Sequence, residues 1–135
     1  MSNTKKTVLE SLAASLQALD SVKTATRNLL TPNKARDAVP YVGMIAGTEE
    51  VLVEDATDIR YGLDVDLLLV TKGDDIEEMI AEIKGYLYNT SAAVNLGVKM
   101  IRLIGQQPVT LIEQDGFSSS RIVVYIVYVA SKGGF

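Results

Sequence analysis

The sequence predicts an α+β fold in which two main α-helices pack on a mostly antiparallel β-sheet. Two segments repeat their apolar residues at spacings of three and four, which is the period of an amphipathic helix. Several other segments have the length and pattern of β-strands, and short loops join neighbouring ones, which favours antiparallel pairing. With 135 residues, 47% of them apolar, the chain can build one core, so residues 1–135 are interpreted as a single α/β domain.

The first helix is predicted from about Thr4 to Leu30. Lys23 and Arg27 near its end suit the negative pole of the helix dipole, and the cluster at 31–33 supplies a stop. Its apolar residues fall on one stripe, which predicts packing on the sheet of the same subunit more readily than a seam against another subunit. The stripe consists of Val8, Leu9, Leu12, Leu16, Leu19, Val22 and Leu29.

Three strand-like segments follow the first helix. Tyr41–Ala46 is typical of a short strand, and Glu50–Glu54 of a second strand or of a projecting arm. The clearest strand runs from Ile59 to about Thr71, with alternate residues apolar throughout. The residues between these apolar ones are mostly charged up to Asp66 and apolar from Leu68 onward. One end of this strand is therefore expected to be covered on both faces.

A second helix is predicted after the turn at 72–75 and is ended by Asn89-Thr90-Ser91. Its acidic first turn suits the positive pole of the helix dipole. Strands are then expected at Val98–Ile104, at Val109–Glu113 and from about Arg121 to Ser131. The last of these is apolar in both phases, which predicts burial on both faces. The apolar stripe of the helix is Ile76, Met79, Ile80, Ile83 and Leu87.

Missing residue types and motifs limit the catalytic and cofactor chemistry open to this chain. The chain has no Cys, which excludes disulfides and thiolate chemistry, and no His, which removes the usual general base and the commonest transition-metal ligand. Phosphate-binding glycine motifs are also missing. We therefore expect a protein that binds other proteins without a cofactor, and not an enzyme.

The charge and hydropathy patterns argue against nucleic-acid and membrane partners. The net charge is −4 and the basic residues are scattered, whereas proteins that grip nucleic acid carry a basic stripe. No apolar stretch approaches the roughly 18 residues needed to span a bilayer. We expect neither sequence-specific nucleic-acid binding nor a membrane partner.

Asp64 and Asp66 lie two residues apart on one strand and point the same way. Such a pair can hold a magnesium ion, which leaves open a metal-assisted enzyme. A solvated strand face explains the two carboxylates more simply, because no third ligand has a predictable position.

An apolar triplet within an acidic segment is the main candidate for a binding surface. Such a triplet is typical of a subunit-joining arm or an added edge strand, with a plain β-hairpin of the same domain as the alternative. Phe117 and Phe135 join the candidate interface because they lie in polar or terminal surroundings. The segment comprises Glu49, Glu50, Val51, Leu52, Val53 and Glu54.

The final strand gives a separate indication of assembly. It needs cover on both faces, yet each helix offers only one apolar stripe. If both helices lie on one side of the sheet, a partner is expected to cover part of the other side.

The order of these pieces resembles the small tail-terminator (tail-completion) proteins of long-tailed bacteriophages. The resemblance covers nearly the whole chain and is one of pattern, without a diagnostic motif. Its pieces are the opening helix Val8–Leu30, the entry Val39-Pro40-Tyr41-Val42, an acidic loop, the alternating strand Arg60–Val70, the helix Asp75–Ile83 and the closing strand Ile122–Val129.

This resemblance implies a tail-terminator-like subunit of a homo-oligomeric ring, commonly a hexamer, at the head-proximal end of the tail in the virion, assembled in the host cytoplasm. Such a ring stops polymerisation of the tail tube and contacts the tube protein and the head-completion or neck protein. The acidic segment 49–58 would then serve subunit or tube contacts, or line a channel through which DNA only passes, because an acidic wall repels DNA. Two alternatives remain open: another neck or tail-completion protein, and a small-molecule or regulatory binding module of α+β type.

Overall fold

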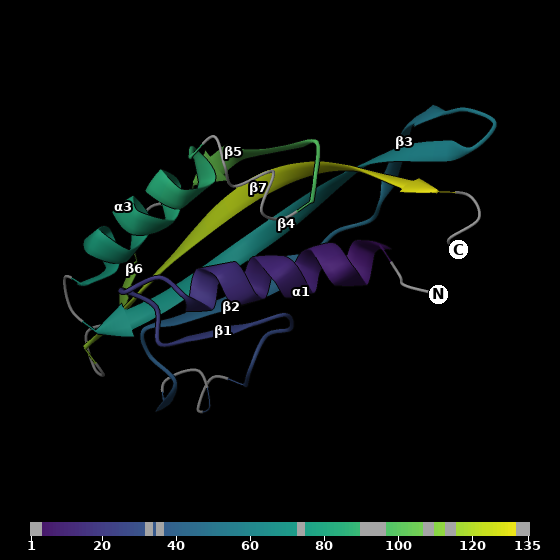
Figure 1. The fold of residues 1–135 in the computed structure, drawn as a ribbon. Coiled ribbons are helices and arrows are strands. Elements are labelled where there is room, and N and C mark those ends of the chain that lie inside the picture. The colour runs from purple at the N-terminus through teal and green to yellow at the C-terminus, as the bar shows by residue number, and fades with distance from the viewer. Residues whose placement is uncertain are drawn as a thin grey trace.

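The computed structural model describes residues 4–31, 34, 37–72, 75–89, 97–106, 110–112 and 116–131. Its described strands form one seven-stranded sheet, antiparallel except where β1 pairs with β2 (Figure 1). The central path of the sheet is β1-β2-β4-β7-β5, with β3 beside β4 and β6 beside β7. The predicted α+β class is confirmed. The strands are β1 (Thr24–Thr26), β2 (Tyr41–Ala46), β3 (Glu50–Glu54), β4 (Asp58–Lys72), β5 (Met100–Gln106), β6 (Thr110–Ile112) and β7 (Phe117–Ser131).

Two long helices, α1 (Thr4–Gln17) and α3 (Asp75–Leu87), pack on the same face of this sheet. Their apolar stripes join one core cluster with alternate residues of β4 and β7, which places both helices over one side of the central strands. The acidic first turn and basic last turn of α3 complement its dipole. The shared core includes Leu12 and Leu16 of α1, Ile76, Met79 and Ile83 of α3, Leu63, Val65, Leu67 and Leu69 of β4, and Ile122, Val124 and Ile126 of β7.

The prediction of one helix from Thr4 to Leu30 is wrong, because α1 ends at Gln17 and β1 follows. Val22, Thr24 and Thr26 are β-branched, which lowers helix propensity and favours a strand. The turn between the two elements is held from outside: the backbone N and the hydroxyl of Ser21 donate hydrogen bonds to Glu82 Oε1, at 3.0 and 2.9 Å. The apolar spacing continues beyond the end of the helix because Leu19 and Val22 of this turn also pack on the core.

β4 and β7 form the long axis of the molecule. Each has 15 residues, so each is roughly 50 Å long, and they pair along their whole length. The predicted strand from Ile59 to Thr71 is confirmed, while β7 begins at Phe117, four residues before the predicted start. The predicted strands at 41–46 and 50–54 match β2 and β3, and those at 98–104 and 109–113 overlap β5 and β6.

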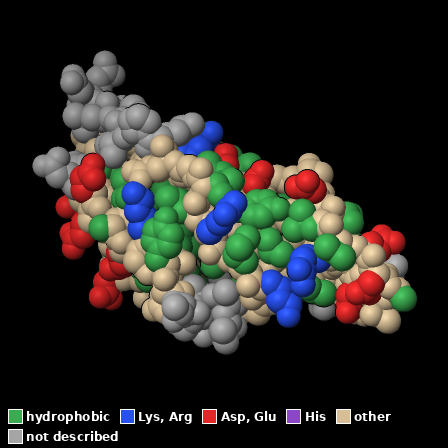
Figure 2. All heavy atoms as spheres, turned by 90° about the horizontal axis from the view of Figure 1, so that it is seen from above, with side chains coloured by type: hydrophobic (Ala, Val, Ile, Leu, Met, Phe, Trp, Pro, Cys, Tyr) green, Lys and Arg blue, Asp and Glu red, His purple; other side chains and the backbone are tan. Residues whose placement is uncertain are grey.

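The side of the sheet away from the helices, here called the helix-free face, is only partly covered. Val123, Tyr125 and Val129 of β7 and Leu68 and Val70 of β4 are half-buried, whereas Val127 is buried. The predicted burial on both faces, of β7 and of one end of β4, is therefore incomplete within one subunit. No described helix lies over them. Figure 2 looks at the molecule from above and shows hydrophobic side chains in a band along this view, with Lys and Arg side chains among them.

Candidate interaction site

β3 is fully exposed and projects from the body of the subunit. It pairs with the first residues of β4, opposite the stretch Ile59–Gly62, and Figure 1 shows this hairpin reaching beyond the helices. Val51 and Val53 are each 55% exposed and Leu52 is 40% exposed. A β-bulge at Leu52 breaks the regular register and turns the strand. The structure therefore has the predicted apolar triplet in a hairpin whose apolar side chains face solvent.

The tip of this hairpin is shaped by Asp55. Its Oδ1 accepts hydrogen bonds from the backbone N of Thr57 and of Asp58, at 2.8 and 2.7 Å, and the backbone N of Asp55 donates to the Asp58 carbonyl at 3.0 Å. An aspartate that binds the backbone two and three residues ahead fixes a turn. The hairpin is thus held by its own hydrogen bonds at the end farthest from the core.

Glu49 has a different place from the rest of the predicted acidic segment. It is half-buried just before β3 and accepts a hydrogen bond from the hydroxyl of Tyr128, a core residue of β7. Burial, followed by this bond to the carboxylate, raises the pKa of Tyr128 far above its usual value. The Tyr128 ring also packs against that of Tyr61, with centroids 5.7 Å apart. Glu49 therefore anchors the base of the hairpin to the core.

Of the two phenylalanines in the predicted interface, the structure describes only Phe117. Phe117 is only 8% exposed at the start of β7, and the Lys72 ammonium lies 5.6 Å from its ring centroid. The Phe117 side chain is thus covered within its own subunit, and its place in an interface stays a prediction. Phe135 lies outside the described residues.

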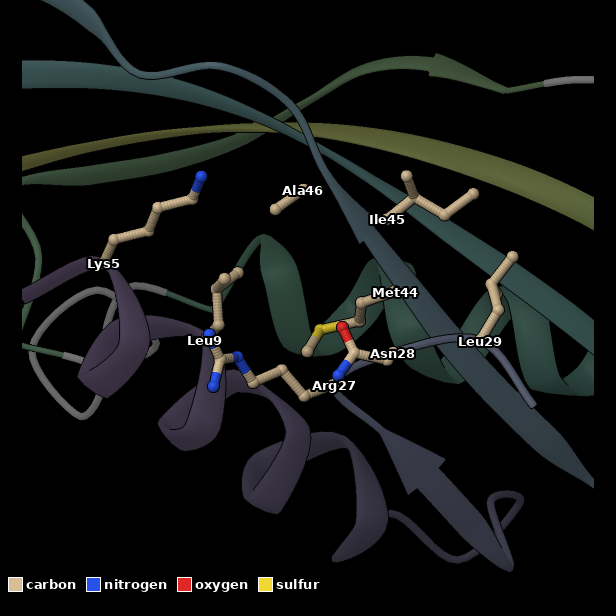
Figure 3. Close-up of a pocket in the computed structure, with 8 residues that line it drawn as sticks. All are labelled: Lys5, Leu9, Arg27, Asn28, Leu29, Met44, Ile45 and Ala46. Atoms are coloured by element: carbon tan, nitrogen blue, oxygen red, sulfur yellow. The ribbon is translucent and has the colours of Figure 1, made fainter. Parts of the chain in front are cut away.

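A hollow of about 500 Å³ lies on the other side of β2 from β4. It is lined by Lys5 and Leu9 of α1, by the segment Arg27–Leu29 after β1, and by Met44–Ala46 of β2. Figure 3 shows the Arg27 guanidinium beside Leu9 and the Lys5 side chain extending toward Ala46, with Leu29 and Ile45 at the other end. The hollow thus combines apolar walls with two cationic groups.

No sequence pattern predicted this hollow. Its lining comes from three segments that are brought together only because the chain leaves α1 at Gln17 and crosses to β1. The segment after β1 is held by Tyr41, whose hydroxyl accepts a hydrogen bond from the Leu30 backbone N at 3.0 Å and lies 2.7 Å from Thr26 Oγ1.

The carboxylate pair of β4 lies on the helix-free face. Asp64 is exposed, and Asp66 Oδ2 lies 3.6 Å from an Arg121 guanidinium nitrogen, which balances its charge. Across the described ranges, no group of three or more acidic side chains is placed to hold a metal ion. The pair is therefore accounted for as part of a polar strand surface.

Of the helices in the described part of the chain, none has the length and apolar character needed to cross a membrane. No model of a known protein family matches the chain, and no characterised protein matches it significantly in sequence. The function has therefore to be inferred from the residues and their geometry.

Proposed function

We propose that the chain is a structural virion protein, a tail terminator whose copies form a ring at the head-proximal end of a phage tail tube. The ring stops tube polymerisation and joins the tail to the neck, and its partners are the tube protein and a head-completion protein. It requires no catalysis and no cofactor. The sequence resemblance described above supports this position in the tail.

The observation that carries the proposal is the exposed hairpin of β3. A monomer gains nothing from three consecutive apolar residues in solvent on a strand that projects from its core. The helix-free face is a second, different surface, on which half-buried apolar side chains of β4 and β7 lie beside the carboxylates of Asp64 and Asp66. A hairpin that contacts a different surface of the next copy makes a head-to-tail contact, and such contacts close into a ring when the rotation between copies allows it.

The net charge supports a ring that surrounds DNA without gripping it. At −4 per copy, a ring carries a negative field that repels phosphates and lets the duplex slide. The same charge opposes association of the copies at low ionic strength, and added magnesium screens that repulsion.

The test is the solution mass, measured by light scattering after size exclusion over a wide range of concentration, with and without magnesium. We expect a closed assembly of several copies, or a monomer that converts to one. A chain that stays monomeric under all these conditions contradicts the proposal.

Leu52→Asp tests the hairpin itself, because it places a charge in the exposed triplet without touching the core. We expect this variant to lose the assembly and to leave tail tubes of uncontrolled length. Tyr88→Asp is the matched control, since Tyr88 is 63% exposed at the end of α3, away from the hairpin. Unchanged assembly and unchanged tail length in Leu52→Asp would refute the role given to β3.

A further inference from the structure

Half of β2 presents an open strand edge. β1 pairs only with Tyr41–Gly43, and no strand among the described residues lies beside the outer edge of Met44–Ala46. Ile45 in this stretch is 41% exposed. An unpaired edge with exposed apolar side chains is a template for a further strand.

The hollow described above lies directly against this open edge. Its apolar lining would receive the side chains of an added strand, and Lys5 and Arg27 place positive charge beside that strand. Both cations have exposed partners: Lys5 Nζ donates a hydrogen bond to the Gly47 carbonyl at 3.1 Å, and an Arg27 guanidinium nitrogen lies 3.9 Å from Glu10 Oε1. The chemistry of the edge therefore favours an extended segment that is apolar in the middle and acidic at its ends.

β3 is a segment of this kind. It reads Glu50-Val51-Leu52-Val53-Glu54, it is already extended, and it is roughly 17 Å long. No strand among the described residues lies beside its outer edge at Val51–Val53. β3 cannot reach the open edge of its own subunit, because β2 and β3 lie one after the other along the same side of β4.

We propose that β3 of one copy pairs with the open edge of β2 (Met44–Ala46) in the next copy, with its apolar triplet over the hollow and an acidic end beside Lys5 and Arg27. Backbone hydrogen bonds supply the affinity of such an added strand, and the apolar and charged pockets supply its specificity. This inference deepens the proposed ring by naming the contact between its copies, and in that respect it rests on the proposed function.

The charges of β3 argue against the obvious alternative, a symmetric pairing of two β3 strands. In an antiparallel pair centred on Leu52, Glu50 of each copy faces Glu54 of the other copy. In a parallel pair, each glutamate faces the same glutamate of the other copy. Like charges directly opposite one another destabilise a strand pair. Pairing with β2 replaces these repulsions by attraction, so the charges select the head-to-tail contact.

Engineered disulfides test the contact directly, because the chain has no cysteine of its own. Ile45→Cys is mixed with a second variant that carries Cys in place of Val51, Leu52 or Val53, and the mixtures are oxidised. We expect a covalent heterodimer with at least one of the three, and little cross-linking within any single variant. Tyr88→Cys in place of Ile45→Cys is the control and should not cross-link to β3.

A mixing experiment tests the head-to-tail geometry without covalent chemistry. Leu52→Asp damages the donor strand and Ile45→Asp damages the acceptor edge, and both residues are exposed enough for the folds to survive, which circular dichroism checks. Each variant alone should be monomeric. The mixture should form a dimer with one copy of each, because one intact strand and one intact edge remain. Arg27→Glu should weaken assembly of the otherwise unchanged chain by about tenfold or more.

The outcomes separate this contact from the ring itself. Assembly of the unchanged chain without cross-linking at Ile45, or with β3 cross-linked to β3, overturns the β3–β2 contact and leaves the ring standing. Cross-linking at Ile45 in open chains that never close supports the contact and contradicts the ring. A chain that remains monomeric and gives no cross-link overturns both.

Discussion

Tyr41→Phe should destabilise the subunit although it removes a single oxygen. Tyr41 is completely buried, and its hydroxyl serves the Leu30 backbone N at 3.0 Å and Thr26 Oγ1 at 2.7 Å. The Phe ring keeps the packing over Gly43 but leaves the Leu30 backbone N without its partner, while Thr26 Oγ1 keeps its hydrogen bond to the Asn28 carbonyl. An unsatisfied buried polar group costs about 1–3 kcal/mol, and because Leu30 is only half-buried we expect a loss of about 1 kcal/mol.

The expected change in melting temperature follows from the size of the chain. At roughly 2.1 cal/mol/K per residue, the unfolding entropy of 135 residues is about 0.28 kcal/mol/K, so a loss of about 1 kcal/mol lowers the Tm by about 3.5 °C. Calorimetry at one fixed protein concentration measures this shift, because association alone makes the Tm depend on concentration.

Tyr86→Phe is the matched control and should move the Tm the other way or leave it unchanged. The Tyr86 hydroxyl is buried beside the core, and no described residue offers it a hydrogen bond. Removing it takes away an unpaired polar group instead of creating one. If Tyr41→Phe and Tyr86→Phe lower the Tm equally, the hydrogen bonds of the Tyr41 hydroxyl do not account for the loss, which refutes the role given to this hydroxyl.

Two further predictions concern the core face and the helix-free face. The pKa of Tyr128 lies above the ordinary value of 10.0, so its contribution to stability is complete below pH 10 and is lost as the pH rises further. We compare the unchanged chain with Tyr128→Phe in urea titrations. Above pH 10, the unfolding free energy of the unchanged chain should fall by about 1.4 kcal/mol more per pH unit than that of the variant. A slope equal in both chains would contradict the role of Tyr128. Gly62→Ala should lower the Tm by several degrees, because the new Cβ would lie 1.9 Å from the Tyr125 hydroxyl oxygen, and the loss should shrink in a Tyr125→Leu background.

Local patterns predicted the long elements because those elements bury one face only. β4 keeps one apolar phase over its length, and α3 combines an acidic first turn with a complete apolar stripe. The end of α1 was not predictable from spacing, since Leu19 and Val22 continue the stripe through a turn that also packs on the core. That turn depends on Glu82, which is 61 residues away from Ser21 in sequence and so leaves no local signal.

In the candidate site, too, features with a local sequence signal were predictable and features that join distant residues were not. The hairpin of β3 was predictable because its whole signal, an apolar triplet between acids, lies in five consecutive residues. The anchoring of Glu49 by Tyr128 was not, because 79 residues separate the two. The hollow beside β2 was not either, because it depends on where β1 begins. Phe117 was chosen for its polar surroundings, but the serines that follow it do not mark an exposed segment, because Ser118 and Ser120 are buried in β7.

The exposure of all five β3 residues has a consequence for how this protein can change over evolutionary time. Substitutions at exposed positions outside packed regions usually alter stability by less than about 0.5 kcal/mol. The side chains that would set the choice of partner can therefore drift, or be exchanged between lineages, without endangering the fold, while Glu49 and Asp55 keep the hairpin in place. Homologous subunits should then share their core and differ most in this one strand and in whatever surface receives it.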